Sequence, residues 1–152
     1  MPSFSRTFGS PSGTARINLV VSGPLIRVSI GLPDPWVEAL RSRGFVPPPA
    51  VVGEALIDTG ASLCAIDRIV VERLGLPSRG TERIATFGGF EEEMTHPAQI
   101  EFLDGTLSSR VRDDIVGMDL RPLGVIAIIG RNVLADWNIN YDGPTGTITI
   151  TG

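Results

Sequence analysis

The sequence is poor in the residues that build disulfides and metal centres. Among 152 residues there is one cysteine, Cys64, and one histidine, His96. A single cysteine excludes an internal disulfide framework and is typical of a reducing compartment, so we expect a cytoplasmic location. A zinc site needs several nitrogen or sulfur ligands, which one histidine cannot supply. We therefore expect no metal and no other cofactor.

Concentrated charge and long apolar runs are also missing. The chain has 13 Lys and Arg against 17 Asp and Glu, a net charge of −4, and no basic cluster. This balance argues against a nucleic-acid partner. The longest aliphatic run, 125–129, is far too short to span a bilayer. The first residues lack the apolar core of a signal peptide, so no membrane segment is expected.

What the chain does have is glycine and proline, at 18 and 12 residues, and 42% hydrophobic residues. Many turns between short apolar runs are typical of an all-β protein, either a barrel or a sandwich. The length corresponds to one domain. Residues 1–15 are rich in Ser, Gly and Pro and are interpreted as a flexible N-terminal tail, which leaves 16–152 as the folded domain.

Apolar runs and turn signals divide the domain into short elements. The predicted strands are 16–21, 25–30, 51–57, 63–66, 83–90, 94–102, 125–129, 138–141 and 147–151. Short helical segments are expected at 36–40, at 68–74 and within 130–137. Asp67 is a candidate N-cap for the second of these helices, and Gly75 is the residue that would end it.

One segment carries a candidate catalytic acid. In the run Ala-Leu-Ile-Asp-Thr-Gly-Ala-Ser at 55–62, an apolar strand delivers Asp58 into a tight turn. Gly60 has no Cβ and allows another backbone to approach, while Thr59 places a hydroxyl beside the acid. The tripeptide alone is a weak signal, because an Asp that caps its own turn gives the same pattern.

Two further motifs follow in the chain. Residues 127–134 read Ala-Ile-Ile-Gly-Arg-Asn-Val-Leu, and residues 86–90 read Thr-Phe-Gly-Gly-Phe. With the Asp58 segment, they resemble the retropepsin-like aspartic proteases, in which a glycine-rich flap lies between two signature motifs. The resemblance implies an all-β, closed β-barrel with a flap hairpin, one or two short helices and a two-fold dimer.

The resemblance also implies the chemistry. Asp58, Thr59 and Gly60 are the expected catalytic motif, and peptide hydrolysis by this route uses two carboxylates that share one proton. The chain has one copy of the motif. A homodimer would supply the second Asp58, so the expected partners are a second copy and a peptide or protein substrate.

Further positions receive roles from the same resemblance. Contacts with an extended peptide are expected from Leu56, Ala61, Thr86, Phe87, Gly88, Ile126 and Ile128. Support of the catalytic turn is expected from Gly130, Arg131 and Asn132. Arg131 should be ion-paired, yet Ser62 and Leu63 occupy the positions where related viral enzymes have an acidic pair. The hairpin after Trp137 is expected to build the dimer sheet.

Alternatives remain open. The same fold could bind peptides as a dimer without hydrolysing them. The activity could also be self-processing that removes the N-terminal tail. Ala61, in place of a hydroxyl residue, favours a mildly acidic pH optimum. Cys64 is interpreted as a buried, inert thiol, Trp137 as a core or interface anchor, and 91–93 as a solvated acidic turn.

Overall fold

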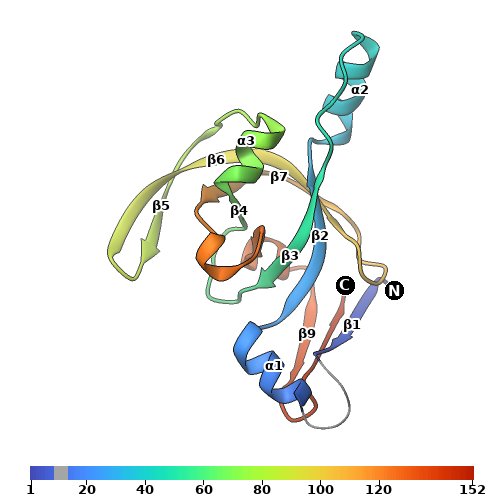
Figure 1. Cartoon of the computed structure of the whole chain (residues 1–152), viewed down its shortest axis with the longest axis vertical. Helices are drawn as coiled ribbons and strands as arrows, with labels where there is room; N and C mark the ends of the chain where they lie inside the picture. The colour runs from blue at the N-terminus through green and yellow to red at the C-terminus, as the bar shows by residue number, and fades with distance from the viewer. Residues whose placement is uncertain (9–13) are drawn as a thin grey trace.

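The structure is a computed structural model that describes residues 1–8 and 14–152. Most of its regular elements are strands, in two sheets, which confirms the mostly β expectation. A small sheet near the chain ends lies below the larger sheet, and one helical arm projects from the opposite end (Figure 1). No helix in the described ranges is long and apolar enough to cross a membrane.

The small sheet joins the two ends of the chain. It contains β1 (Ser3–Thr7), β10 (Thr147–Thr151) and β9 (Asn138–Asp142), in the order β1-β10-β9 and antiparallel throughout. Phe4, Ile148 and Ile150 turn inward and are buried in the main core. The expected terminal hairpin is therefore present.

The expected N-terminal tail needs a correction. Residues 3–7 form a strand in which Phe4 points inward and is 3% exposed. This strand pairs with β10 and completes the small sheet. Sequence patterns could not give this pairing, since the partner strand lies at the other end of the chain. The stretch 9–13 of the expected tail lies outside the described residues.

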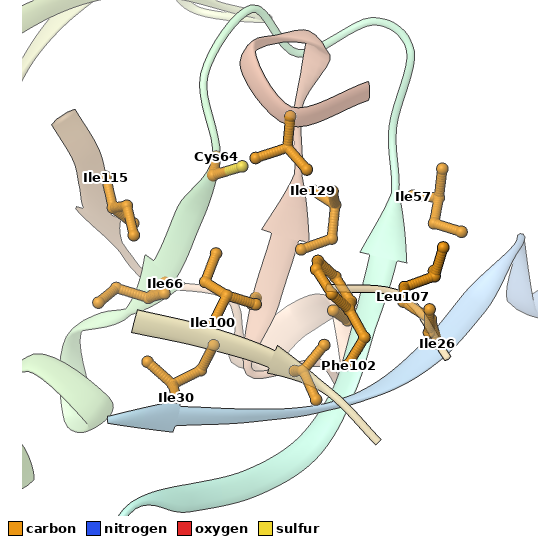
Figure 2. Close-up of a cluster of buried hydrophobic side chains, with 14 of the residues drawn as sticks. Ile26, Ile30, Ile57, Cys64, Ile66, Ile100, Phe102, Leu107, Ile115 and Ile129 are labelled. Atoms are coloured by element: carbon orange, nitrogen blue, oxygen red, sulfur yellow. The ribbon is translucent and has the colours of Figure 1, made fainter. Parts of the chain in front are cut away.

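The large sheet has seven strands. They are β2 (Leu25–Gly31), β3 (Val51–Ile57), β4 (Ala65–Asp67), β5 (Gly80–Thr86), β6 (Gly89–Phe102), β7 (Arg110–Met118) and β8 (Ala127–Ile129). Their order is β2-β3-β8-β4-β7-β6-β5, and β2 also pairs with β6. The pairings from β2 through β6 thus return to β2, and β5 extends beyond them. Apolar side chains from these strands meet in one core, shown for Ile57, Ile100 and Ile129 in Figure 2.

The described residues form four α-helices: α1 (Thr14–Ser22), α2 (Asp34–Ser42), α3 (Arg68–Leu74) and α4 (Arg131–Leu134). The resemblance implied one or two, and the sequence patterns predicted helical segments at α2, α3 and α4. A 3-10 turn, η1, covers Arg121–Leu123. Helix α2 contains the predicted 36–40 segment and forms the projecting arm (Figure 1). Helix α3 begins and ends as predicted, because Asp67 accepts a hydrogen bond from the Ile69 amide and Gly75 is left-handed.

The predicted strand 16–21 is wrong, because these residues lie in α1. Ala15 and Leu19, four residues apart, are buried on the same side of the helix. Gly23 then ends the helical path with φ of +72° and donates its amide to the Leu19 carbonyl. The run of Ile, Leu and Val between them has strand-like composition, and tertiary packing overrides it.

Trp137 and residues 91–93 test two smaller expectations, and the single histidine can also be placed. Trp137 is 8% exposed and packs edge-on against Phe102, as expected of a core anchor. Residues 91–93 are not a turn, because they lie within β6 and pair with β5. His96 is buried and its Nδ1 lies 3.0 Å from the Pro77 carbonyl oxygen.

Candidate active site

Asp58 lies directly after β3, in the turn that the sequence predicts. Strand β3 runs parallel to β8, and β8 runs antiparallel to β4. The Asp58 amide continues this pairing by donating to the Ile129 carbonyl at 3.0 Å. The acid therefore sits at the end of the parallel β3–β8 pair, with its backbone fixed by the sheet.

The turn around Asp58 closes on its own side chain. The Gly60 amide donates to Asp58 Oδ1 at 2.7 Å, and the Ala61 amide donates to the Asp58 carbonyl at 3.2 Å. A Cβ on Gly60 would lie 3.0 Å from Asp58 Oδ1. Glycine at this position thus lets the carboxylate lie over the following backbone, which orients one oxygen inward. Asp58 is partly buried, whereas Thr59 is exposed.

Arg131 supports the same turn through backbone carbonyls. Its Nη1 donates to the Thr59 carbonyl at 2.7 Å and to the Gly60 carbonyl at 2.9 Å. Its amide also donates to the Ala61 carbonyl at 2.8 Å. The supporting role expected of Arg131 is therefore present in the geometry. The expected ion pair is not found among the described residues, since Ser62 and Leu63 supply no acid.

A buried platform lies behind the turn. A Cβ on Gly130 would collide with the Leu63 carbonyl, so only glycine allows this approach. Asn132 Oδ1 accepts from the Cys64 amide at 3.0 Å and lies 3.2 Å from its Sγ. The Gly130 amide donates to Cys64 Sγ at 3.3 Å. These contacts tie the start of α4 to the chain that follows the catalytic turn.

Cys64 belongs to the platform and not to the reactive groups. It is fully buried and is one of the core side chains drawn in Figure 2. Burial raises the pKa of the Cys64 thiol to about 11, although the hydrogen bond from the Gly130 amide opposes this rise. A thiol in this environment stays protonated at neutral pH and is a poor nucleophile. The interpretation of an inert thiol is consistent with this geometry.

Strands β5 and β6 form a hairpin whose tip is Phe87 and Gly88. Thr86 pairs with Gly89, which has φ of +123°, so only two residues make the turn. Thr86 Oγ1 donates to the Gly89 carbonyl at 3.2 Å and also lies 3.3 Å from Glu91 Oε1. Phe87 is fully exposed. The hairpin projects from the body beside α3 (Figure 1).

A cleft of about 480 Å³ lies between the turn and the hairpin, within the size range of ligand sites. Of the residues predicted from the sequence, Asp58, Gly60, Ala61, Ile128 and Arg131 line it. Segments from four separate parts of the chain therefore converge on one space that contains the candidate acid.

Other predicted residues lie elsewhere. Leu56 faces a second groove together with residues of α1. Ile126 packs against Gly53, where a Cβ would lie 2.9 Å from Ile126 Cγ2. Thr86, Phe87 and Gly88 are at the hairpin tip and do not line the cleft in a single chain. Their roles as substrate contacts remain predictions.

Several cleft residues were not singled out from the sequence. Ile84, Glu82 and Met118 line the cleft beside Asp58. Ile84 had a usable signal, because strand alternation places it two residues before Thr86 on one face of the hairpin. No local sequence signal identifies Met118, since its place in the cleft depends on its parallel pairing with Asp67.

Comparisons with known proteins bear on this site. Residues 50–119 match the family model described as aspartyl protease. The matched segment includes the Asp58 turn, the β5–β6 hairpin and β7, and it ends before the second motif at 127–134. No curated protein matches the chain.

Proposed function

We propose that this protein is an aspartic endopeptidase that is active as a homodimer. The premise is that residues 50–119 belong to the aspartyl protease family. The observation that carries the proposal is the Asp58 carboxylate at the floor of a cleft roofed by the β5–β6 hairpin. The ring of strand pairings from β2 to β6 would then correspond to the retropepsin-like barrel, and the hairpin to its flap.

The dimer follows from the chemistry. Hydrolysis without a covalent intermediate needs one carboxylate to accept a proton from water and another to donate a proton to the substrate carbonyl. One chain brings one Asp58 to the cleft, so the second acid comes from the partner. Two carboxylates about 3 Å apart cannot both ionise readily, and the pair therefore holds one shared proton.

The proposed reaction proceeds in two stages of proton transfer. The ionised Asp58 accepts a proton from water as the oxygen attacks the scissile carbonyl carbon, while the protonated Asp58 donates its proton to the carbonyl oxygen. In the second stage, the Asp58 that gave its proton takes one from a hydroxyl of the tetrahedral diol, the C–N bond breaks, and the Asp58 that took the proton of water gives it to the leaving nitrogen, which restores the starting pair. Arg131 keeps the turn in place by its bonds to the Thr59 and Gly60 carbonyls.

Substitution of the acid tests this proposal. Asp58→Asn keeps the shape of the side chain but removes the ionisable group, so cleavage of a peptide library between pH 4 and 7 should fall by at least about 1,000-fold. Asp113→Asn, at an exposed strand position, is the matched control and should cleave like the unmodified protein. Unchanged cleavage by Asp58→Asn would overturn the proposal.

A peptide-binding module without turnover is the second candidate. The observation that favours it is that a single chain holds one catalytic carboxylate in an open cleft. This candidate predicts that peptides bind to the unmodified dimer but remain intact over days at every pH from 4 to 7. Mass spectrometry of the recovered peptides separates the two functions.

A further inference from the structure

Helix α2 lies on the surface along its whole length, and none of its residues is fully buried. Trp36 and Leu40 share one face with Arg43, which directly follows the last turn, because these residues are spaced at i, i+4 and i+7. Val37 and Arg41 belong to another face and line a different hollow of the surface. The helix therefore presents two separate surfaces to its surroundings.

The face that contains Trp36 lines a groove of about 340 Å³ between α2 and α3. Leu74, in the last turn of α3, lies in the facing wall and is 3% exposed. Trp36 and Leu40 are half-buried, and Ala39 is exposed, so much of the lining is apolar surface open to solvent. We refer to the groove lined by Trp36, Ala39, Leu40, Arg43 and Leu74 as the α2–α3 groove.

The charges at the α2–α3 groove are cationic. Arg43 lines the groove, and the guanidinium carbon of Arg79 lies 5.6 Å from the centre of the Trp36 ring. Among the residues that the structure describes, no carboxylate lines the groove, and neither arginine forms an ion pair. An apolar groove bordered by cations is complementary to a ligand that carries both apolar groups and carboxylates.

The α2–α3 groove is separate from the cleft that contains Asp58, since no residue lines both. The projecting arm enters the start of β3 at Val51, whereas Asp58 follows the end of that strand (Figure 1). Seven residues of extended chain span roughly 20 Å. A ligand in the groove therefore lies well away from the residues on either side of a bond cleaved at Asp58.

We infer that the α2–α3 groove docks an acidic segment of a protein substrate, with large apolar side chains as its anchors. The apolar anchors cover Leu40 and Leu74, and the carboxylates meet Arg43 and Arg79. The role in substrate recognition rests on the proposed function, whereas binding of the segment does not require catalysis. Docking at a second point raises the effective concentration of the scissile segment at the cleft.

The shape of this surface favours a peptide over a lipid bilayer. The groove has walls from two helices, and a groove of this kind accepts anchor side chains of a peptide one at a time. A bilayer would instead meet the protruding tip of the arm, where Phe45 and Val46 are exposed and lie outside the groove lining. The two surfaces can therefore be tested separately.

Peptide selection with a charge reversal tests the inference. The bait is the full chain with Asp58→Asn, and the probe is a displayed library of random twelve-residue peptides. The library is first passed over the same bait with Arg43→Glu added, which removes peptides that bind elsewhere. Acidic sequences containing Leu or Phe should then be enriched, and their Kd should rise about 10-fold with Arg43→Glu, because an attraction becomes a repulsion.

Arg41→Glu is the matched control for this experiment. It makes the same charge change in the last turn of α2, but Arg41 lines the other hollow. The selected peptides should bind this variant with a Kd within about two-fold of the bait. Ala39→Glu is a second variant, since Ala39 is exposed within the groove and its substitution removes no buried contact. It should weaken binding as Arg43→Glu does.

Kinetics of the active protein link the groove to substrate recognition. A peptide substrate fused through a flexible linker to a selected acidic sequence should show a lower KM than the unfused substrate. Arg43→Glu should raise the KM of the fused substrate about 10-fold and leave its kcat unchanged. The unfused substrate should be cleaved equally by Arg43→Glu, Arg41→Glu and the unmodified protein.

The outcomes separate the two proposals. Equal binding by Arg43→Glu and Arg41→Glu, or a selection without acidic sequences, overturns docking in the groove. Binding to phosphatidylcholine–phosphatidylglycerol vesicles that Phe45→Ser abolishes and acidic peptides do not compete overturns it in favour of a lipid surface. If acidic peptides bind with the expected charge dependence but the unmodified protein cleaves nothing, the groove stands and the protease proposal fails.

Discussion

The catalytic turn and the β5–β6 hairpin face the same cleft, yet they are held in different ways. The turn is fixed by a guanidinium, by a glycine pressed against backbone and by a half-buried asparagine, Asn132. The hairpin depends on its strand ladder and on exposed side chains such as Thr86. The floor is thus fixed by close packing, whereas the roof is held mainly by its strand pairing.

The largest difference in stability between the two regions is expected when one methyl group is added to each. Gly130→Ala places a Cβ against the Leu63 carbonyl and should lower the free energy of unfolding by about 3 kcal/mol or more. Gly88→Ala, at the hairpin tip, meets no atom closer than 3.8 Å and should change it by less than about 0.5 kcal/mol. Urea unfolding of both variants tests the comparison, and equal losses would contradict it.

The second largest difference is expected when one arginine side chain is removed from each region. Arg131→Ala leaves the Thr59 and Gly60 carbonyls without their donor and should lower stability by about 1–3 kcal/mol, with cleavage reduced at least 10-fold. Arg83→Ala removes a guanidinium that stacks on Phe90 at 4.2 Å, which is worth about 0.5–1 kcal/mol at an exposed site. A larger loss of stability from Arg83→Ala than from Arg131→Ala would contradict the conclusion that the catalytic turn is held more firmly than the hairpin.

Alkaline pH provides a test confined to the floor. Because the pKa of Cys64 is raised from 9.0 to about 11, the unfolded chain loses this proton first as the pH rises. The stabilising contribution is complete below pH 9 and is lost between pH 9 and 11, by roughly 2–3 kcal/mol. Cys64→Ala should not show this loss, and parallel urea unfolding at pH 8 and 10.5 measures the difference.

The smallest expected effect lies at the hairpin tip. Thr86→Val removes the hydroxyl that bonds the Gly89 carbonyl across an exposed turn. Stability should change by less than about 1 kcal/mol, because water can replace an exposed hydrogen bond. The KM for peptide cleavage should change more than kcat if the tip moves during binding, and Thr81→Val on the same strand is a suitable control.

Local signals along the chain predicted much of the fold. The cap of α3 by Asp67, the strand before Asp58 and the terminal hairpin each depend on neighbouring residues, and each is present. Two elements near the N-terminus were not predictable in this way. Strand β1 depends on a partner at the far end of the chain, and α1 has the composition of a strand.

The candidate site was predictable to a similar extent. Asp58 and its support by Arg131 follow from motifs, but the partners of Arg131 are carbonyl oxygens, which no pattern of side chains reveals. Leu56 lines a second groove with residues of α1 and does not line the cleft, and Gly23 lies close against its side chain. Residues such as Met118 reach the cleft through parallel pairing, which is a long-range property of the sheet.

The pairing of the first and last strands has a consequence for synthesis of the chain. Ser3 pairs with Thr151, so β1 has no partner until the ribosome has synthesised β10. Gly146, beside β10, also packs against Ala15 at the start of α1. Helix α1 therefore gains this support only after β10 has been synthesised. Until then, β1 and α1 both lack contacts that hold them against the body of the molecule.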